Sequence, residues 1–477
     1  MVKDRITEYF EAHSGEMLAR LSALCAIPSV QGDFEPGKPF GTEVDAVLRL
    51  AADMFTEEGF SVERDPEGRY ILASFSEGEH SIGLFAHGDV VPPGEGWTLT
   101  DPFVPRLVED ILVARGAHDN KAGIVASLYL FKAIRELGIP VRSRLVCFVG
   151  GNEETGMLDV QAYRASHKVP DVSLVPDNSY PLSLGEKGRA TAWLVSPPLL
   201  SDILDFSGGN AYNVVLDNAE ATLAYSPSLA SLLSGAVADR PEFTLSLDDG
   251  KGRIALSAKG RPAHAADPGN GINAAALIAE VLASCPALSA DERGVMASAA
   301  MFLSDPYGGA LGMAGSDGVF GRRTAAAGMV RVRDGRFFIS QDIRFGTGIA
   351  WEELLALIEE GADAEDFEVL VDTATDAFDL GDEASEVAPL MAAYARITGD
   401  DQARPYRSGG GTYAKYLPNA YSVGVLYRPE GEAHRLVPEK HGGAHAPDEF
   451  IRVGAFLDSL RILMEYITTL DGILNNV

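Results

Sequence analysis

Apolar residues recur along the first 187 positions with two different spacings, which predict alternating helices and strands. Apolar positions three or four residues apart predict helices over residues 3–24, 42–58, 121–137 and 159–166. Short apolar or alternating runs predict strands over residues 60–64, 70–75, 82–86, 144–149 and 172–175. Strands that alternate with helices are typical of an α/β domain, whose mostly parallel sheet carries helices on both faces.

The pattern changes between residues 188 and 382, where strand-like runs mix with alanine-rich helices such as 273–282 and 351–360. The α/β pattern then returns, with helices expected over 384–398 and 448–470 and a strand over 421–425. We therefore predict an α/β domain formed by residues 1–187 and 383–477, with an inserted α+β domain of residues 188–382. Two domains also suit 477 residues, which exceed what one hydrophobic core usually holds.

Charge and apolar composition exclude two classes of partner. The formal net charge is −30, so the surface repels phosphate backbones and anionic lipid, and we expect neither nucleic-acid nor membrane partners. No apolar run approaches the roughly 18 residues of a membrane span, and the first residues carry no apolar signal region. Three scattered cysteines in apolar settings (Cys25, Cys147 and Cys285) are typical of reduced core thiols. We expect a cytoplasmic protein.

Acidic and histidine side chains follow the predicted strands at the points where each strand ends. They are His87 and Asp89 after strand 82–86, Glu153 and Glu154 after strand 144–149, and Asp177 after strand 172–175. Asp119 stands just before helix 121–137. Because α/β sheets bind ligands outside the carboxyl ends of their strands, we expect these side chains to share one site. Imidazole and carboxylate donors together suit Zn, Mn or Co.

Each of these residues also has an ordinary structural explanation, and His87 by itself is more often a structural histidine than a ligand. Asp119 stands where a helix N-cap is expected, and Asp177 follows a proline in a typical turn. Glu153 and Glu154 are adjacent acids, and most such pairs are solvated turns. Their position directly after a strongly apolar strand favours the functional interpretation.

A second histidine ligand is expected near the C-terminus. His445 precedes the last predicted helix, and His434 and His441 lie close to it in the sequence. Spacing alone does not choose among the three.

The order of these motifs resembles the aminoacylase/carboxypeptidase family of two-metal peptidases, and within it the peptidase V-type dipeptidase branch. The resemblance covers nearly the whole chain. The motifs that carry it are His87-Gly88-Asp89-Val90-Val91-Pro92, Arg115-Gly116 with Asp119-Asn120-Lys121, Asn152-Glu153-Glu154-Thr155-Gly156, Pro176-Asp177, Gly260-Arg261-Pro262-Ala263-His264-Ala265, Gly271-Ile272-Asn273-Ala274 and Ser408-Gly409-Gly410-Gly411-Thr412-Tyr413-Ala414.

The resemblance implies two divalent metal ions per chain, with zinc preferred and manganese or cobalt as alternatives. Asp119 would bridge both ions, His87 and Asp177 would complete one site, and Glu154 and His445 the other. Glu153 would be the general base, and Asp89 would orient His87. The family also implies a cis peptide bond between Asp119 and Asn120. Many relatives carry a second aspartate where this chain has Asn120.

The inserted domain would act as a lid over the substrate. By resemblance, His264 would stabilise the oxyanion, and Asn213 and Arg344 would hold the substrate. The turn formed by Gly410, Gly411 and Thr412 would offer backbone N–H groups to the substrate carboxylate, as a helix N-terminus can. A lid of this size could supply its histidine within one chain, so we expect a monomer, with a dimer as the alternative.

These inferences predict a metal-dependent dipeptidase, in which a water held between the metals attacks the peptide bond of a dipeptide with free termini. One alternative is an N-acyl amino acid deacylase of the same fold. Another is a non-catalytic relative that binds metal or peptide, which predicts loss of Glu153 or a ligand, whereas all are present. A serine hydrolase finds no support, because the sequence has no Gly-x-Ser-x-Gly motif.

Overall fold

The computed structural model describes residues 2–427 and 434–476, and its chain forms two compact units. The first comprises the chain up to Gly185, Leu380–Tyr406 and the chain from Thr412 onwards. The second comprises Glu186–Asp379 and Arg407–Gly411. The sequence analysis placed the corresponding boundaries after residues 187 and 382. It also assigned residues 407–411 to the first domain, whereas they group with the second unit.

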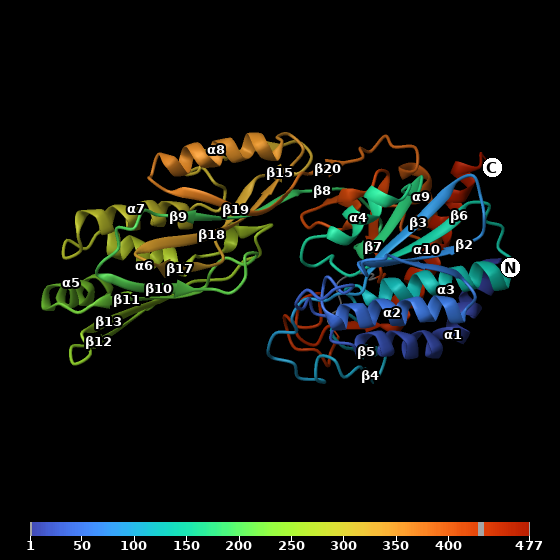
Figure 1. Ribbon diagram of the computed structural model, residues 1–477, viewed down its shortest axis with the longest axis horizontal. Helices are drawn as coiled ribbons and strands as arrows, with labels where there is room; N and C mark the ends of the chain where they lie inside the picture. The colour runs from blue at the N-terminus through green and yellow to red at the C-terminus, as the bar shows by residue number, and fades with distance from the viewer. Residues whose placement is uncertain (1, 428–433, 477) are drawn as a thin grey trace. The chain divides into compact units, whose positions relative to one another are not determined.

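The first unit contains a mixed sheet flanked by helices (Figure 1). Its strands run in the order β1 (Ser61–Arg64), β2 (Tyr70–Phe75), β6 (Arg144–Gly150), β3 (Ser81–His87), β7 (Val172–Asn178), β22 (Ala420–Gly424) and β8 (Ser183–Glu186). Its helices are α1 (Val2–Cys25), α2 (Thr42–Glu57), α3 (Lys121–Leu137), α4 (Leu158–Ser166), α9 (Val387–Thr398), α10 (Val453–Leu474) and the short 3-10 helix η2 (Tyr413–Tyr416). A small second sheet joins β4 (Arg106–Val108), β5 (Ile111–Val113) and β23 (Phe450–Arg452).

The central strands β6, β3, β7 and β22 are parallel, whereas β1, β2 and β8 pair antiparallel at the edges. The α/β prediction is therefore confirmed, with the parallel part limited to the centre. Along β3, Ile82, Leu84 and Ala86 belong to the core that α1, α2, α3, α9 and α10 cover. Phe85 points to the opposite face, where its ring stacks on Phe148 and meets Tyr163 of α4. Both faces are covered, which explains why the strands read as apolar runs.

Helix α3 has the bounds that its apolar spacing predicts, and it ends at Gly138 in the left-handed conformation, with φ 63°. The last helix begins at Val453 rather than at residue 448. The reason is long-range: Phe450–Arg452 pair with Ile111–Val113 as strand β23, so these residues are extended and the helix starts after them.

The second unit is an antiparallel sheet with helices packed on it, as an α+β domain requires. The strand order is β12 (Phe243–Asp248), β13 (Arg253–Lys259), β11 (Asn218–Ala224), β10 (Ile203–Gly208), β17 (Val330–Arg333), β18 (Arg336–Phe345), β9 (Gly188–Val195) and β19 (Glu368–Thr375), with β16 (Thr324–Ala326) paired to β18. The helices are α5 (Pro227–Val237), α6 (Ala274–Ala283), α7 (Ala290–Ser304), α8 (Trp351–Asp363) and the 3-10 turn η1 (Pro268–Asn270). A hairpin joins β14 (Ser316–Asp317) to β15 (Gly321–Arg322).

Strands β20 (Phe378–Asp379) and β21 (Tyr406–Ser408) lie where the chain passes between the units. Across the described ranges, no helix has the length and apolar character needed to cross a bilayer.

Candidate metal centre

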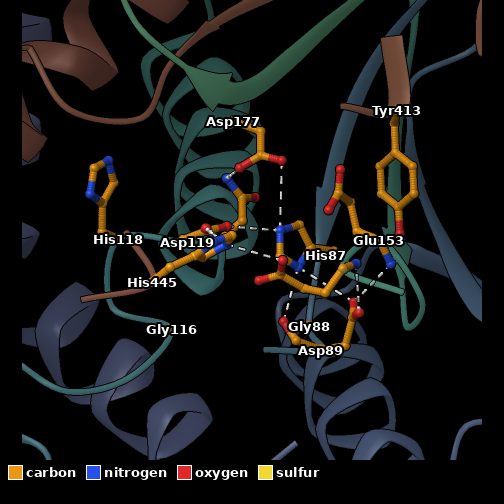
Figure 2. A network of polar contacts seen from close by, with 12 residues as sticks. His87, Gly88, Asp89, Gly116, His118, Asp119, Glu153, Asp177, Tyr413 and His445 are labelled. Carbon is orange, nitrogen blue, oxygen red and sulfur yellow. Dashed lines mark hydrogen bonds and ion pairs between the residues drawn. The ribbon is translucent and has the colours of Figure 1, made fainter. Parts of the chain in front are cut away.

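Three parallel strands bring their carboxyl ends to one edge of the first sheet. His87 is the last residue of β3 and pairs in register with Gly150, the last residue of β6. The turn after β6 carries Glu153, and β7 ends just after Asp177. Asp119 stands in the turn before α3. The structure therefore gathers these side chains at one edge, as Figure 2 shows.

One group of possible metal ligands consists of His87, Asp119 and Asp177. The Nε2 atom of His87 lies 3.0 Å from Oδ1 of Asp119 and 3.6 Å from Oδ2 of Asp177. His87 is fully buried, and its other nitrogen, Nδ1, is 2.9 Å from the backbone oxygen of Asp89. That hydrogen bond leaves Nε2 aimed at the two carboxylates.

A second group consists of Asp119, Glu154 and His445. The Nε2 atom of His445 lies 3.0 Å from Oδ2 of Asp119 and 3.1 Å from Oε2 of Glu154. The two rival histidines lie elsewhere: His441 Nδ1 is 2.7 Å from Oδ2 of Asp448, and His434 Nε2 is 3.1 Å from Oδ1 of Asp110. The structure thus brings His445, and neither rival, to this group.

Asp119 is common to both groups, and its two oxygens face different histidines. Burial raises the pKa of Asp119, but the hydrogen bonds from His445 and His87 outweigh burial and hold that pKa well below its usual range. The same contacts act on the histidines. Burial lowers the pKa of His87, but Asp177 and Asp119 outweigh it and raise the pKa well above the ordinary value. Hydrogen bonds to Asp119 and Glu154 raise the pKa of His445 to about 11.

The two adjacent glutamates are buried beside these groups. Burial, followed by the negative charge of Asp177, raises the pKa of Glu153 well above its ordinary value. Burial and the charge of Asp119 also raise the pKa of Glu154. The Oε1 atoms of both glutamates are buried without a hydrogen-bond partner among the described residues. Several carboxylates crowded around two imidazoles fit divalent cations, because a cation would neutralise the charges and contact the free oxygens.

Asp89 contacts both His87 and the turn that carries the two glutamates. Its side chain accepts hydrogen bonds from the backbone N–H groups of Glu153, at 3.2 Å, and Glu154, at 3.1 Å. The atom that contacts His87 most closely is the backbone oxygen of Asp89, whereas Oδ1 lies 3.4 Å from His87 Nδ1. The carboxylate therefore holds the turn that carries both glutamates and stays close to the histidine.

The peptide bond between Asp119 and Asn120 is cis, as the family resemblance implies. The side-chain amide of Asn120 donates to the backbone oxygen of Pro176, at 2.6 Å, and to Oδ1 of Asp177, at 2.9 Å. Asn120 thus touches a candidate ligand, a contact that the sequence analysis did not identify. Because Asn120 sits at the N-cap position of α3 without a side-chain cap, the N-cap explanation of Asp119 does not hold.

Sequence reasoning also missed two buried acids around the site. Asp159 accepts hydrogen bonds from the backbone N–H of Asn152, at 2.8 Å, and from the Tyr413 hydroxyl. Glu449 accepts from backbone N–H groups of the turn that contains Asp119. The only signal for Glu449 was its position four residues after His445.

The second unit carries His264, Asn213 and Arg344. His264 is exposed and bridges in antiparallel fashion to Val214, and the backbone oxygen of Asn213 accepts from Ala265 N–H at 2.9 Å. These contacts place His264 and Asn213 on adjacent segments of one surface of that unit.

Arg344 is buried and firmly held. Its Nε and Nη2 atoms donate to the two oxygens of Asp342, at 2.5 and 3.1 Å, and Nη1 donates to the backbone oxygen of Gly409 at 2.9 Å. Arg189 also pairs with Asp342, at 3.1 Å. The carboxylate of Asp342 thus fixes the plane of the Arg344 guanidinium within the second unit.

The glycine-rich turn was expected to offer backbone N–H groups in the manner of a helix N-terminus, and it precedes the four-residue 3-10 helix η2. Thr412 is the N-cap and accepts from Ala414 N–H, at 3.2 Å. Gly410 N–H donates to Ser408 Oγ at 3.1 Å, and Gly411 ends the segment that groups with the second unit. One of the backbone donors expected to meet substrate is therefore engaged locally.

Comparison with known proteins assigns this chain to a family. The model of peptidase family M20/M25/M40 matches residues 83–469. Two bacterial relatives carry the name putative dipeptidase. They are YtjP of Bacillus subtilis, 29% identical over 448 residues (91% of this chain and 92% of that one), and a Staphylococcus aureus protein, 25% identical over 484 residues (98% and 99%).

Solved structures share the fold at low sequence identity. The crystal structure of human carnosine dipeptidase 1 superposes with a TM-score of 0.60 at 15% identity, covering 98% of this chain and 99% of that one. The di-peptidase Dug1p from Saccharomyces cerevisiae also gives 0.60, at 14% identity and 98% coverage of both chains. The family model spans most of the chain, including every candidate ligand, so this protein belongs to peptidase family M20/M25/M40 and is a metallopeptidase.

Proposed function

We propose that this protein is a two-metal dipeptidase that hydrolyses dipeptides with free termini. The observation that carries the proposal is the position of Asp119, whose two oxygens face two separate histidine–carboxylate groups. A carboxylate shared in this way is what a pair of neighbouring cations requires. Family membership and the names of the bacterial relatives support a peptidase that acts on short peptides.

We assign His87, Asp119 and Asp177 to one ion, and Asp119, Glu154 and His445 to the other. The donors are two imidazoles and three carboxylates, a mixture that suits zinc best, with manganese or cobalt as alternatives. When bound, two such ions lower the pKa of water and polarise the scissile carbonyl.

We assign the general base to Glu153, which belongs to neither ligand group. Its carboxyl is buried beside both groups, where a general base must lie to reach a water held between them. Glu153 would take the proton of the attacking water and then pass it to the leaving amine. Asp89 supports this role, because its side chain anchors the backbone of Glu153.

We propose that the second unit is a lid that supplies substrate contacts, with His264 as the oxyanion donor and Asn213 and the turn of Gly410, Gly411 and Thr412 beside the substrate. Arg344 would bind the C-terminal carboxylate. A guanidinium has five N–H groups, and the bonds of Arg344 to Asp342 and Gly409 use three of them. Two N–H groups thus remain for a carboxylate.

We also propose that the protein is a cytoplasmic monomer. The three free thiols, Cys25, Cys147 and Cys285, are all buried, which suits a reducing compartment. The second unit is large enough to supply the lid histidine from the same chain, so no second copy is needed to complete the site.

The test is hydrolysis of a panel of dipeptides and their N-acetylated counterparts. The enzyme is assayed after chelation and after addition of zinc, manganese or cobalt. Cleavage of the free dipeptides, lost with chelator and restored by metal, is the expected result. Cleavage of only the acetylated compounds would identify an N-acyl amino acid deacylase instead. Absence of activity with every metal would refute the proposal and favour a metal- or peptide-binding protein.

A further inference from the structure

The carboxylate of Glu449 is fully buried and receives four hydrogen bonds. Its Oε1 accepts from the backbone N–H groups of His118, at 2.8 Å, and Asp119, at 3.0 Å. Its Oε2 accepts from the backbone N–H of Gly116, at 3.1 Å, and from Arg115 Nη1, at 2.5 Å. One side chain therefore holds the backbone of the whole turn that ends at Asp119.

This contact continues a short strand pairing. Strands β5 and β23 are antiparallel, with Val113 opposite Phe450, and Ala114 N–H donates to the backbone oxygen of Glu449 at 3.0 Å. The next N–H group, that of Arg115, donates instead to the backbone oxygen of Pro102, at 2.8 Å. The N–H groups of the turn that follows donate to the side chain of Glu449. The same C-terminal segment carries His445, whose ring lies beside Asp119 (Figure 2). The candidate ligands Asp119 and His445 are thus both positioned where the segment after β5 meets the segment before β23.

The donors around Glu449 call for a carboxylate rather than an amide. Each oxygen faces two N–H donors, and only an ionised carboxyl offers acceptors at both positions. A glutamine of the same size would turn its NH₂ group towards one pair of donors and lose both bonds. Substitution by glutamine therefore removes hydrogen bonds with little change of volume.

We propose that Glu449 is a positioning residue for the metal centre, which sets the place of Asp119 through the backbone of residues 116–119. The inference rests on the proposed function, because it takes Asp119 as the ligand shared by two ions. Displacement of a shared ligand weakens the binding of both ions. Loss of Glu449 should therefore lower the affinity of both metal sites rather than of one. Within the described part of the chain, the hydrogen bond of Glu449 to a candidate ligand goes to the backbone N–H of Asp119, so Glu449 acts through the backbone and is not a catalytic residue.

A purely structural role is the competing explanation, since Glu449 also pairs with the buried Arg115. If charge compensation were its whole role, removal of either partner would have the same effect on metal binding. The two roles therefore separate when Glu449→Gln is compared with Arg115→Gln, which leaves the backbone contacts of Glu449 in place.

Asp471 offers a matched control. It is a buried carboxylate that accepts backbone N–H bonds from Arg142, at 3.0 Å, and Ser143, at 2.7 Å. These residues precede β6, whereas the metal centre lies beyond the other end of that strand. Asp471→Asn thus removes a comparable acceptor far along the sheet from the candidate ligands.

The experiment measures zinc affinity and stoichiometry by competition with a chromophoric chelator, and the absorption spectrum of the cobalt-loaded protein, without substrate. Glu449→Gln is expected to weaken zinc binding about 10- to 100-fold and to change the cobalt spectrum. Arg115→Gln and Asp471→Asn are expected to keep the affinity and the spectrum of the parent. Thermal unfolding of each variant is also measured, so that a loss of stability can be distinguished from a loss of zinc affinity.

Unchanged zinc affinity in Glu449→Gln, or equal losses in Glu449→Gln and Arg115→Gln, would overturn the inference. If Glu449→Gln does not fold, Glu449→Asp decides, because it keeps the charge beside Arg115 but shortens the side chain by one bond, about 1.5 Å. Weak zinc binding by folded Glu449→Asp supports the inference, and parental binding or a failure to fold overturns it. The metal-binding experiment uses no substrate, so its result does not depend on catalytic activity. An inactive parent enzyme would refute the dipeptidase proposal, whereas the effect of Glu449→Gln on zinc binding could still be measured.

Discussion

Replacement of Glu153 by glutamine gives the sharpest test of the mechanism. The side chain keeps its size, and the backbone N–H of residue 153 keeps its bond to Asp89. Neither ligand group includes Glu153, so both ions should remain bound. What is lost is the proton acceptor, and removal of a general base typically costs about 100- to 10,000-fold in rate. That loss corresponds to about 2.7–5.4 kcal/mol in activation free energy.

The electrostatics of the site predict a second effect of Glu153→Gln, on the stability of the metal-free protein. The pKa of Glu153 is raised by burial and by the charge of Asp177. The folded state therefore binds this proton more tightly than the unfolded state, and stability falls as pH rises from the ordinary pKa of a glutamate to the raised value. Glutamine carries no charge, so the metal-free variant should be at least as stable as the parent at pH 8.

Three measurements check these expectations. Steady-state hydrolysis of a dipeptide gives kcat and KM, and elemental analysis after desalting gives the metal content. Thermal unfolding in chelator gives the stability of the metal-free state, with Glu35→Gln, at an exposed glutamate paired with Lys38, as the control. Activity within tenfold of the parent would refute the assignment of the base. Loss of a metal ion would instead make Glu153 a ligand.

Three further predictions concern the histidine ligand, the substrate contact and a buried acid. His445→Ala should weaken zinc binding at least about tenfold, whereas His434→Ala and His441→Ala should not, and equal losses in titrations of the three would contradict the ligand assignment. Arg344→Lys should raise KM for free dipeptides about 10- to 100-fold with a smaller change in kcat, because a bidentate contact is lost, and an unchanged KM would argue against the contact. Burial and the charge of Asp89 raise the pKa of Asp159 to about 6. Its contribution to stability should thus fall by about 3 kcal/mol as pH rises from about 4 to about 6. In urea unfolding with chelator, the loss of stability over this range should therefore be smaller by about that amount for Asp159→Asn than for the parent.

Much of the fold was predictable from local pattern. The apolar spacing of α3 and the glycine after it predict the observed bounds, Lys121–Leu137, because a helix buried on most sides needs apolar residues throughout and a left-handed residue to stop it. The central strands were equally clear, since strands covered on both faces are continuous apolar runs. The start of α10 was missed, because the pairing of Phe450–Arg452 with β5 overrides the local helical spacing.

Several candidate ligands could be identified because they follow strands whose carboxyl ends meet at one edge of a sheet. His87, Glu154 and Asp177 are of this kind, and the sequence by itself indicated that they would lie together. The family resemblance was also present in the sequence alone, and the family model confirms it over residues 83–469.

Only the tertiary structure decided which groups from the C-terminal segment join them. The sequence spacing of His434, His441 and His445 does not show which of them is a ligand. It is the path of the loop before β23 that brings His445 to Asp119. The partners of Glu449 are backbone N–H groups more than 300 positions away, and a backbone N–H carries no signal in the sequence. Periodicity reports which face of an element is buried, whereas contacts between distant loops depend on how the elements pack, and those contacts complete the metal centre.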